Sequence, residues 1–230
     1  MTDEIAGSAD VVEGAAFVTA KGDLRMNFGI PHLLSAALMC RKLGELEAAN
    51  KGKEFGEFWE DILAHACAVL FLAVSALESY GNELFVDHET VFPDVKPKVM
   101  ADLWELLERQ PILRKYEFAL LLRGSTSFNR DRTPYQDMLK VIDLRNGLMH
   151  FKPEWLSAQK EHAKLSRNLA HRATRPPFFK ENEPLFPKGW VSHATAKWIV
   201  RSVLEFILEF EQRAGIKGRM AVFQHRFDEL

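Results

Sequence analysis

Cysteine and long apolar runs are scarce in this chain of 230 residues. Its two cysteines, Cys40 and Cys67, are too few for a disulfide framework, and both lie in apolar, helix-like sequence. We therefore expect reduced, buried thiols. The longest apolar run, from Ala66 to Leu77, has about half of the roughly 20 residues that a membrane span needs. We expect a core helix there and no membrane anchor.

The sequence also lacks the short motifs of common metal and cofactor enzymes. His88-Glu89 is not followed by a second histidine at the spacing of a zinc protease. There is no CxxC pair, no P-loop, no glycine-rich dinucleotide fingerprint and no GxSxG elbow. The remaining histidines have no ligand-like spacing, so we expect neither a metal nor a cofactor.

Charge of one sign is not in excess. The chain has 30 Lys and Arg against 32 Asp and Glu, a net charge of −2, which by itself indicates neither nucleic acid nor a membrane as partner. The acidic beginning, MTDEIAGSAD, does not resemble a secretory leader. We therefore expect a cytoplasmic protein.

Apolar residues recur at helical spacing over most of the chain, which predicts an all-α fold. We expect a single domain over residues 31–230. Residues 1–30 form an N-terminal arm, with a β-like patch from Ala15 to Thr19. The expected helices cover 32–49, 58–87, 98–108, 111–122, 153–170 and 191–213. The second of these is apolar nearly all round, so we place it at the centre.

The stretch from Val141 to Trp155 brings Arg145, Asn146 and His150 together. A permanent cation, a polar amide and an imidazole that titrates near neutral pH are the groups that metal-free phosphate chemistry uses. They make this stretch the candidate site.

Two backbones suit this stretch. Asn146-Gly147 between apolar runs is typical of a β-hairpin. Thr133-Pro134-Tyr135-Gln136 instead resembles a helix capping box, and apolar residues repeat from it at steps of three and four. We favour the helix, with His150 in its last turn because Pro153 disfavours helical backbone before it. On an ideal helix Arg145 and His150 lie about 140° apart, so one copy does not readily direct both at one phosphate.

Polar and basic residues elsewhere suggest supporting roles. Glu78 and Asn82 form a polar stripe on the central helix, either as a solvated helix end or as hydrogen-bonding partners of the His150 segment. His162 is interpreted as a packing histidine. Residues 152–180 hold seven Lys and Arg against two acids, a net charge of +5. This run is either a track for an RNA backbone or a solvated basic face. The candidate RNA-binding residues are Lys152, Arg130, Arg132, Lys160, Lys164 and Arg167.

The segment Leu144-Arg145-Asn146-Gly147-Leu148-Met149-His150 resembles the RxxxxH signature of the HEPN superfamily of all-α domains, in which Asn often follows the Arg. The segment from Ser75 to Phe85 is similar to the first core helix of several HEPN families. The resemblance implies a bundle of about four main helices plus accessory helices. It covers about residues 57–213 and leaves the arm outside it.

The resemblance implies a metal-independent endoribonuclease of the toxin or anti-phage defence type. By this match Arg145 and His150 are catalytic and Asn146 supports them. Cleavage by the neighbouring 2′-OH needs a base, an acid and a cation for the phosphorane. Since one chain has one motif histidine, a homodimer is expected. RNA is the expected substrate, and an inhibitory partner protein would restrain the activity.

One position departs from the family pattern. Where HEPN proteins paired with nucleotidyltransferase antitoxins often have Tyr, this chain has Lys152, so that pairing is disfavoured. Two alternatives stay open. The chain could be a non-catalytic helical module that binds nucleic acid or nucleotide or mediates dimerisation. It could also be a helical protein in which Arg145 pairs structurally with Glu78.

Overall fold

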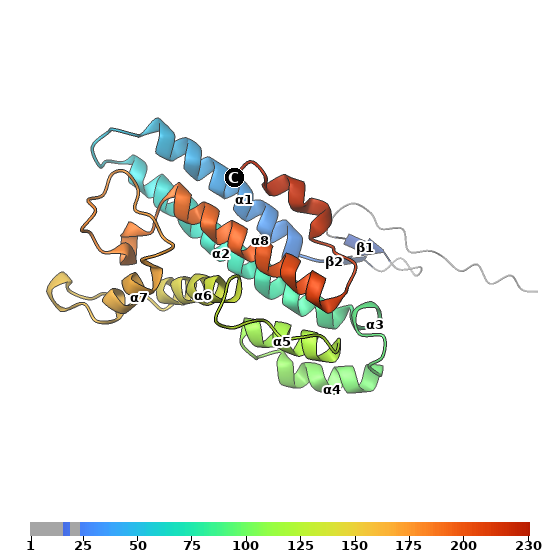
Figure 1. Ribbon diagram of the computed structural model, residues 1–230. Coiled ribbons are helices and arrows are strands. Elements are labelled where there is room, and N and C mark those ends of the chain that lie inside the picture. Colours follow the sequence, from blue (N-terminus) through green and yellow to red (C-terminus); the bar gives the residue numbers. More distant parts are fainter. Residues whose placement is uncertain (1–15, 19–23) are drawn as a thin grey trace, which may run out of the picture.

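The computed structural model describes residues 16–18 and 24–230 and confirms an all-α fold (Figure 1). Three long helices, α1 (Gly29–Ala49), α2 (Phe58–Val86) and α8 (His193–Ala214), lie side by side. The shorter helices are α3 (His88–Val91), α4 (Pro97–Leu107), α5 (Ile112–Leu122), α6 (Tyr135–Met149) and α7 (Glu161–Leu169). A 3₁₀ turn covers Leu156–Ala158, a kinked turn Leu185–Gly189 and a second 3₁₀ helix Ala221–Phe227.

Helix α2 is the centre of the bundle, as its all-round apolar sequence predicts. It packs against α1, α5, α6 and α8, and its buried side chains run from Ile62 to Phe85. By length and composition alone α2 could also cross a membrane. Buried residues nevertheless recur along α2 from Ile62 to Phe85, where other helices of the chain cover it, as in a core helix.

The start of α1 is fixed by a carboxylate of α2. Glu83 accepts hydrogen bonds from the backbone N–H groups of Phe28 (2.8 Å) and Gly29 (2.7 Å), which have no partner inside α1. Burial raises the pKa of Glu83, and these two hydrogen bonds partly oppose that rise. Gly29 lies so close to α2 that a β-carbon on it would come 2.9 Å from Cα of Tyr80. The two helices are therefore joined at one end by polar and packing contacts.

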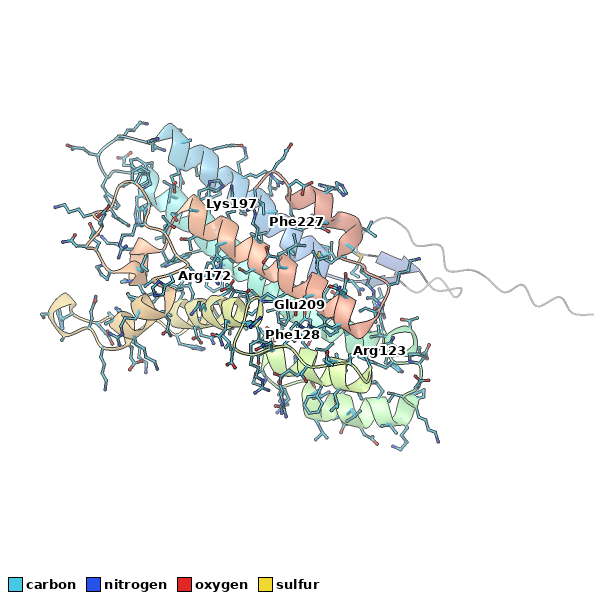
Figure 2. The ribbon with its side chains drawn as sticks, in the orientation of Figure 1. Arg123, Phe128, Arg172, Lys197, Glu209 and Phe227 are labelled. Atoms are coloured by element: carbon cyan, nitrogen blue, oxygen red, sulfur yellow. The ribbon has the colours of Figure 1, made fainter. Side chains whose placement is uncertain are left out.

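Helix α8 has a cap at each end. The hydroxyl of Ser192 accepts a hydrogen bond from the backbone N–H of Thr195 (3.1 Å), and Gly215 ends the helix in the left-handed region (φ 59°). Arg123 donates to the carbonyl oxygens of Ala214 (2.9 Å) and Val91 (3.1 Å) (Figure 2). Arg123, from the loop before the motif helix, thus has a structural role.

The C-terminal segment is held by buried carboxylates. Glu211 of α8 accepts hydrogen bonds from the Tyr80 hydroxyl and from the N–H groups of Arg219 (2.7 Å) and Met220 (2.8 Å). At the end of α2, Asp87 forms ion pairs with both Arg25 and Arg219. One carboxylate therefore joins the N-terminal strands to the C-terminal segment.

The arm contains two short strands. β1 (Ala16–Val18) and β2 (Leu24–Met26) pair antiparallel, with Phe17 opposite Arg25. Residues 16–18 of the β-like patch thus form a strand. The remaining expectations for residues 1–15 and 19–23 lie outside the described residues.

Two local predictions were wrong. The helix expected from Pro153 begins only at Glu161, because residues 151–155 form no helix and only a 3₁₀ turn follows them at Leu156–Ala158. The expected capping box before α6 does not form: no side chain caps that helix, which begins at Tyr135. The Gln136 side chain instead donates to the carbonyl oxygen of Arg130 (2.6 Å).

Candidate functional site

The candidate site is carried by α6, which confirms the helix and excludes the hairpin. Met138, Val141 and Leu144 are buried and hold one face of α6 against α2 and α8. Asp137 on the same side pairs with Arg172 (2.8 Å) beyond the end of α7 (Figure 2). The position of the motif is therefore set by apolar packing and one ion pair.

Gly147 lets α7 approach the motif helix. A β-carbon at this position would come 2.6 Å from Cδ2 of Leu165 and 3.5 Å from the Phe186 ring. Glycine weakens a helix interior by about 1 kcal/mol relative to alanine, but here it provides space for the neighbouring side chains. The Asn-Gly pair is therefore explained by packing and not by a turn.

The three motif side chains occupy different surroundings. Arg145 is half-buried, and its Nε is enclosed without a hydrogen-bond partner, whereas Asn146 and His150 are exposed. His150 is the residue that ends α6, and its N–H bonds to the Asn146 carbonyl oxygen (2.9 Å). Within residues 24–230, no hydrogen bond or ion pair engages any of these three side chains. The alternative in which Arg145 pairs with Glu78 is therefore wrong.

The exposures agree with the angular separation expected from the sequence. Arg145 lies on the flank of α6 near its buried face, and His150 lies on the outer side. On an ideal helix the two side chains leave α6 about 140° apart, so one copy does not readily direct both at one phosphate.

The two supporting residues do not reach the motif. Asn82 accepts a hydrogen bond from Nζ of Lys115 on α5 (2.7 Å), and Glu78 is exposed. Lys115 is buried beside the Trp104 ring, and this burial lowers the pKa of its ammonium group, although Glu78 and Glu108 oppose the shift. The alternative in which Glu78 and Asn82 hydrogen-bond to the His150 segment is therefore wrong. Asn82 instead joins α2 to α5, and Glu78 is solvated.

The basic candidates divide into two groups. Arg130 is held by two hydrogen bonds to Glu117 (both 2.8 Å), which raise the pKa of its guanidinium. The others are exposed and make no ion pair in the described part of the chain: Lys152, Arg132, Lys160, Lys164 and Arg167. Lys164 and Arg167 lie on α7, which packs on α6 beside the motif, and Lys160 directly precedes α7.

The segment between α6 and α7 is anchored by residues that the sequence did not single out. Glu154 accepts hydrogen bonds from the N–H groups of Lys160 (3.0 Å), Glu161 (3.2 Å) and His162 (3.2 Å). Desolvation raises the pKa of Glu154, but these hydrogen bonds outweigh it and lower the pKa overall. His162 is buried, bonds to the Lys152 carbonyl oxygen (2.9 Å) and packs on Phe151, which confirms it as a packing histidine.

Apolar side chains are exposed around the motif. Trp155 is 85% exposed, Met149 57%, Phe151 45% and Leu139 38%. Leu139, Asn146 and His150 lie at steps of seven and four and so share the outer face of α6. We refer to Leu139, Met149, Phe151 and Trp155 as the α6 patch. Exposed large apolar side chains beside a candidate site make this part of the surface a candidate interaction site.

Metal ligands do not gather in the described part of the chain, where no three His, Cys, Asp or Glu side chains lie close enough together to hold an ion. Comparison with known protein families, with curated proteins and with solved structures finds no match. The function of the chain is therefore inferred from the residues of the site themselves.

Proposed function

We propose that this protein is a metal-independent endoribonuclease of the HEPN type that acts as a homodimer. The observation that carries the proposal is that the Arg145 and His150 side chains are both without partners among residues 24–230. Arg145 and His150 lie on a firmly packed helix, and neither side chain is engaged by the rest of the described chain. A buried guanidinium nitrogen without a partner is costly unless a ligand or a second molecule meets it.

The chemistry follows from these groups. One imidazole removes the proton of the 2′-OH, whose oxygen attacks the adjacent phosphorus. The 5′-oxygen leaves and takes a proton from a second imidazole. The products are a 2′,3′-cyclic phosphate and a 5′-OH. The Arg145 guanidinium stabilises the extra negative charge on the phosphorane.

A second copy supplies what one chain lacks. Two-fold symmetry places two motif histidines and two arginines at one groove, although each pair diverges on its own helix. The α6 patch supports this arrangement because protein interfaces have apolar centres rich in aromatic residues and Met. Trp155, which contributes little to its own fold at 85% exposure, is suited to be an anchor.

The test is cleavage of a labelled single-stranded RNA in the presence of EDTA. We expect His150→Ala and Arg145→Ala each to slow cleavage by about 100-fold or more. The matched controls are His171→Ala and Arg109→Ala, which remove exposed residues outside α6 and should cleave as the parent does. Products that end in a 2′,3′-cyclic phosphate are expected.

Other outcomes separate the alternatives. RNA binding without turnover in the parent and in all variants would support the non-catalytic module. Cleavage that continues in both motif variants, or that EDTA abolishes, would contradict the proposal. A lower melting temperature of His150→Ala without any RNA binding would indicate a structural role.

A further inference from the structure

An open pocket of about 320 Å³, lined by polar and apolar side chains, lies between α7 and the segment 175–185. Its volume is at the lower end of the range for small-ligand sites, roughly 300 to 1,000 Å³. Arginine, amide and hydroxyl side chains from both segments form its walls. The residues that line it include Gln159, Ser166, Arg167, Arg175, Asn182 and Glu183.

Several of these side chains are available to a ligand. The hydroxyl of Ser166 accepts a hydrogen bond from the N–H of Phe186 (2.9 Å), and Nε of Arg175 donates one to the carbonyl oxygen of Glu183 (2.6 Å). In contrast, Gln159, Arg167 and Asn182 make no hydrogen bond or ion pair within residues 24–230. The cavity thus offers a free guanidinium and two free amides beside a second arginine whose other nitrogens are not engaged.

The cavity wall is held in place before any ligand arrives. Phe178 and Phe179 pack on Phe58 (ring centroids 5.0 Å apart) and Trp59 (4.9 Å), which fixes the segment to the start of α2. At Gly189 a β-carbon would come 2.4 Å from the carbonyl oxygen of Pro184, so the turn admits only glycine without rearrangement. Preorganised walls reduce the entropy lost on binding.

The cavity also lies next to the proposed cleavage site. Leu165, which contacts Gly147 of α6, directly precedes Ser166 and Arg167 in α7. Packed helix axes are about 8 to 10 Å apart, so the cavity is about one helix width from the motif. Exposed Lys160, directly before α7, and exposed Lys164 of α7 add positive charge to this part of the surface.

We propose that this cavity binds one nucleotide of a single-stranded RNA near the scissile phosphate, an assignment that rests on the proposed function. Arg167 and Arg175 contact the phosphate, for which the planar guanidinium fork is suited. Gln159 and Asn182 present both donors and acceptors to the edge of an unstacked base, which is how proteins read single-stranded RNA. The cavity thereby selects which nucleotide lies beside the cleaved bond.

The test is fluorescence anisotropy of a labelled eight-nucleotide single-stranded RNA, with the full chain carrying His150→Ala so that no cleavage occurs. In that background we expect Arg167→Ala to weaken binding about tenfold or more and Asn182→Ala about threefold or more. Arg167→Lys keeps the charge but loses the fork, and should weaken binding nearly as much as Arg167→Ala. The matched control is Arg109→Ala, which follows α4 at the other end of the molecule (Figure 1).

Equal losses for Arg167→Ala and Arg109→Ala, or full affinity in both Asn182→Ala and Arg167→Lys, would overturn the assignment in favour of diffuse electrostatic attraction. The result is independent of turnover, because binding is measured without cleavage. If the protein cleaves RNA, Asn182→Ala in the active chain should also change the positions of the cuts. Unchanged cut positions with parental affinity would reject the subsite and leave the ribonuclease intact.

Discussion

The hydroxyl group of Tyr80 on α2 donates a hydrogen bond to the carboxylate of Glu211 on α8, inside the bundle. Burial, followed by the neighbouring Glu211, raises the pKa of Tyr80 well above its usual value, so the phenol stays protonated and remains a donor. The same carboxylate also receives two backbone N–H groups of the C-terminal segment. One buried acid thus connects three parts of the chain.

Removing the Glu211 carboxylate should therefore lower the free energy of unfolding far more than removing the Tyr80 hydroxyl. We expect Glu211→Ala to lower the free energy of unfolding by about 3 kcal/mol or more, because three buried donors lose their acceptor. Tyr80→Phe removes one donor and should cost about 1 kcal/mol. Urea unfolding midpoints measure both. Equal losses in the two variants would show that Glu211 does not join the three segments.

The close approach of α1 to α2 at Gly29 gives a second prediction. Gly29→Ala should destabilise the fold by about 1 to 3 kcal/mol, because the new methyl group meets the backbone of Tyr80, which cannot rotate away. This loss should exceed the gain of about 1 kcal/mol in helix propensity. Gly56→Ala is the control, since its β-carbon would have no neighbour closer than 3.8 Å. Stability of Gly29→Ala at or above that of Gly56→Ala would contradict the contact.

His193, at the start of α8, gives a prediction on pH. Burial lowers the pKa of its imidazole, Lys197 lowers it further and Glu47 opposes them. The unfolded chain, with a histidine pKa of about 6.5, then binds the proton more readily than the folded one. The contribution of neutral His193 to the stability of the fold is therefore complete above about pH 6.5. It is lost as the pH falls through the lowered pKa of His193 in the folded protein.

We therefore expect His193→Gln to reduce the loss of stability between pH 7.5 and pH 5.5, as measured by urea midpoints at both values. The control is His225→Gln, which alters an exposed histidine and should keep the parental pH dependence. Identical slopes for the parent and both variants would show that His193 does not titrate differently on folding.

The α6 patch predicts a dimer that one substitution can dissociate. Trp155→Glu should convert a dimer into a monomer in light scattering and abolish RNA cleavage, because it places a charge at the centre of an apolar interface. The melting temperature should change little, since the indole is 85% exposed. Leu121→Glu, at a side chain 68% exposed on α5, should stay dimeric. A parental protein that is monomeric at every concentration would contradict the composite site.

The periodicity of apolar residues was sufficient to predict a helix where burial of its apolar face determines the helix. The ends of α2 and α8 lie within one or two residues of those predicted, because α2 is apolar nearly all round and α8 has a continuous apolar face. His162 was also interpreted correctly, since a lone histidine on an apolar stripe is usually a packing residue. At α6 the helical repeat outweighed the hairpin signal of Asn146-Gly147.

Contacts between distant residues set the features that were predicted wrongly. α7 begins at Glu161 because Glu154, six to eight residues earlier, accepts its first free N–H groups, a pattern that differs from an ordinary N-cap. Asn82 bonds to Lys115, 33 residues away, and no local spacing predicts that pair. The cavity was not predicted because its walls come from two segments that periodicity cannot bring together.

The ion pairs of Asp87 with Arg25 and Arg219 have a practical use. They hold the strand pair and the start of the C-terminal segment at the end of the bundle opposite α7, and the chain then turns back along α1 (Figure 1). A fluorophore or an immobilisation tag fused after Leu230 would therefore lie beside α1, across the bundle from α6. Single-molecule or surface-based measurements of RNA engagement can accordingly be made without obstructing the face under study.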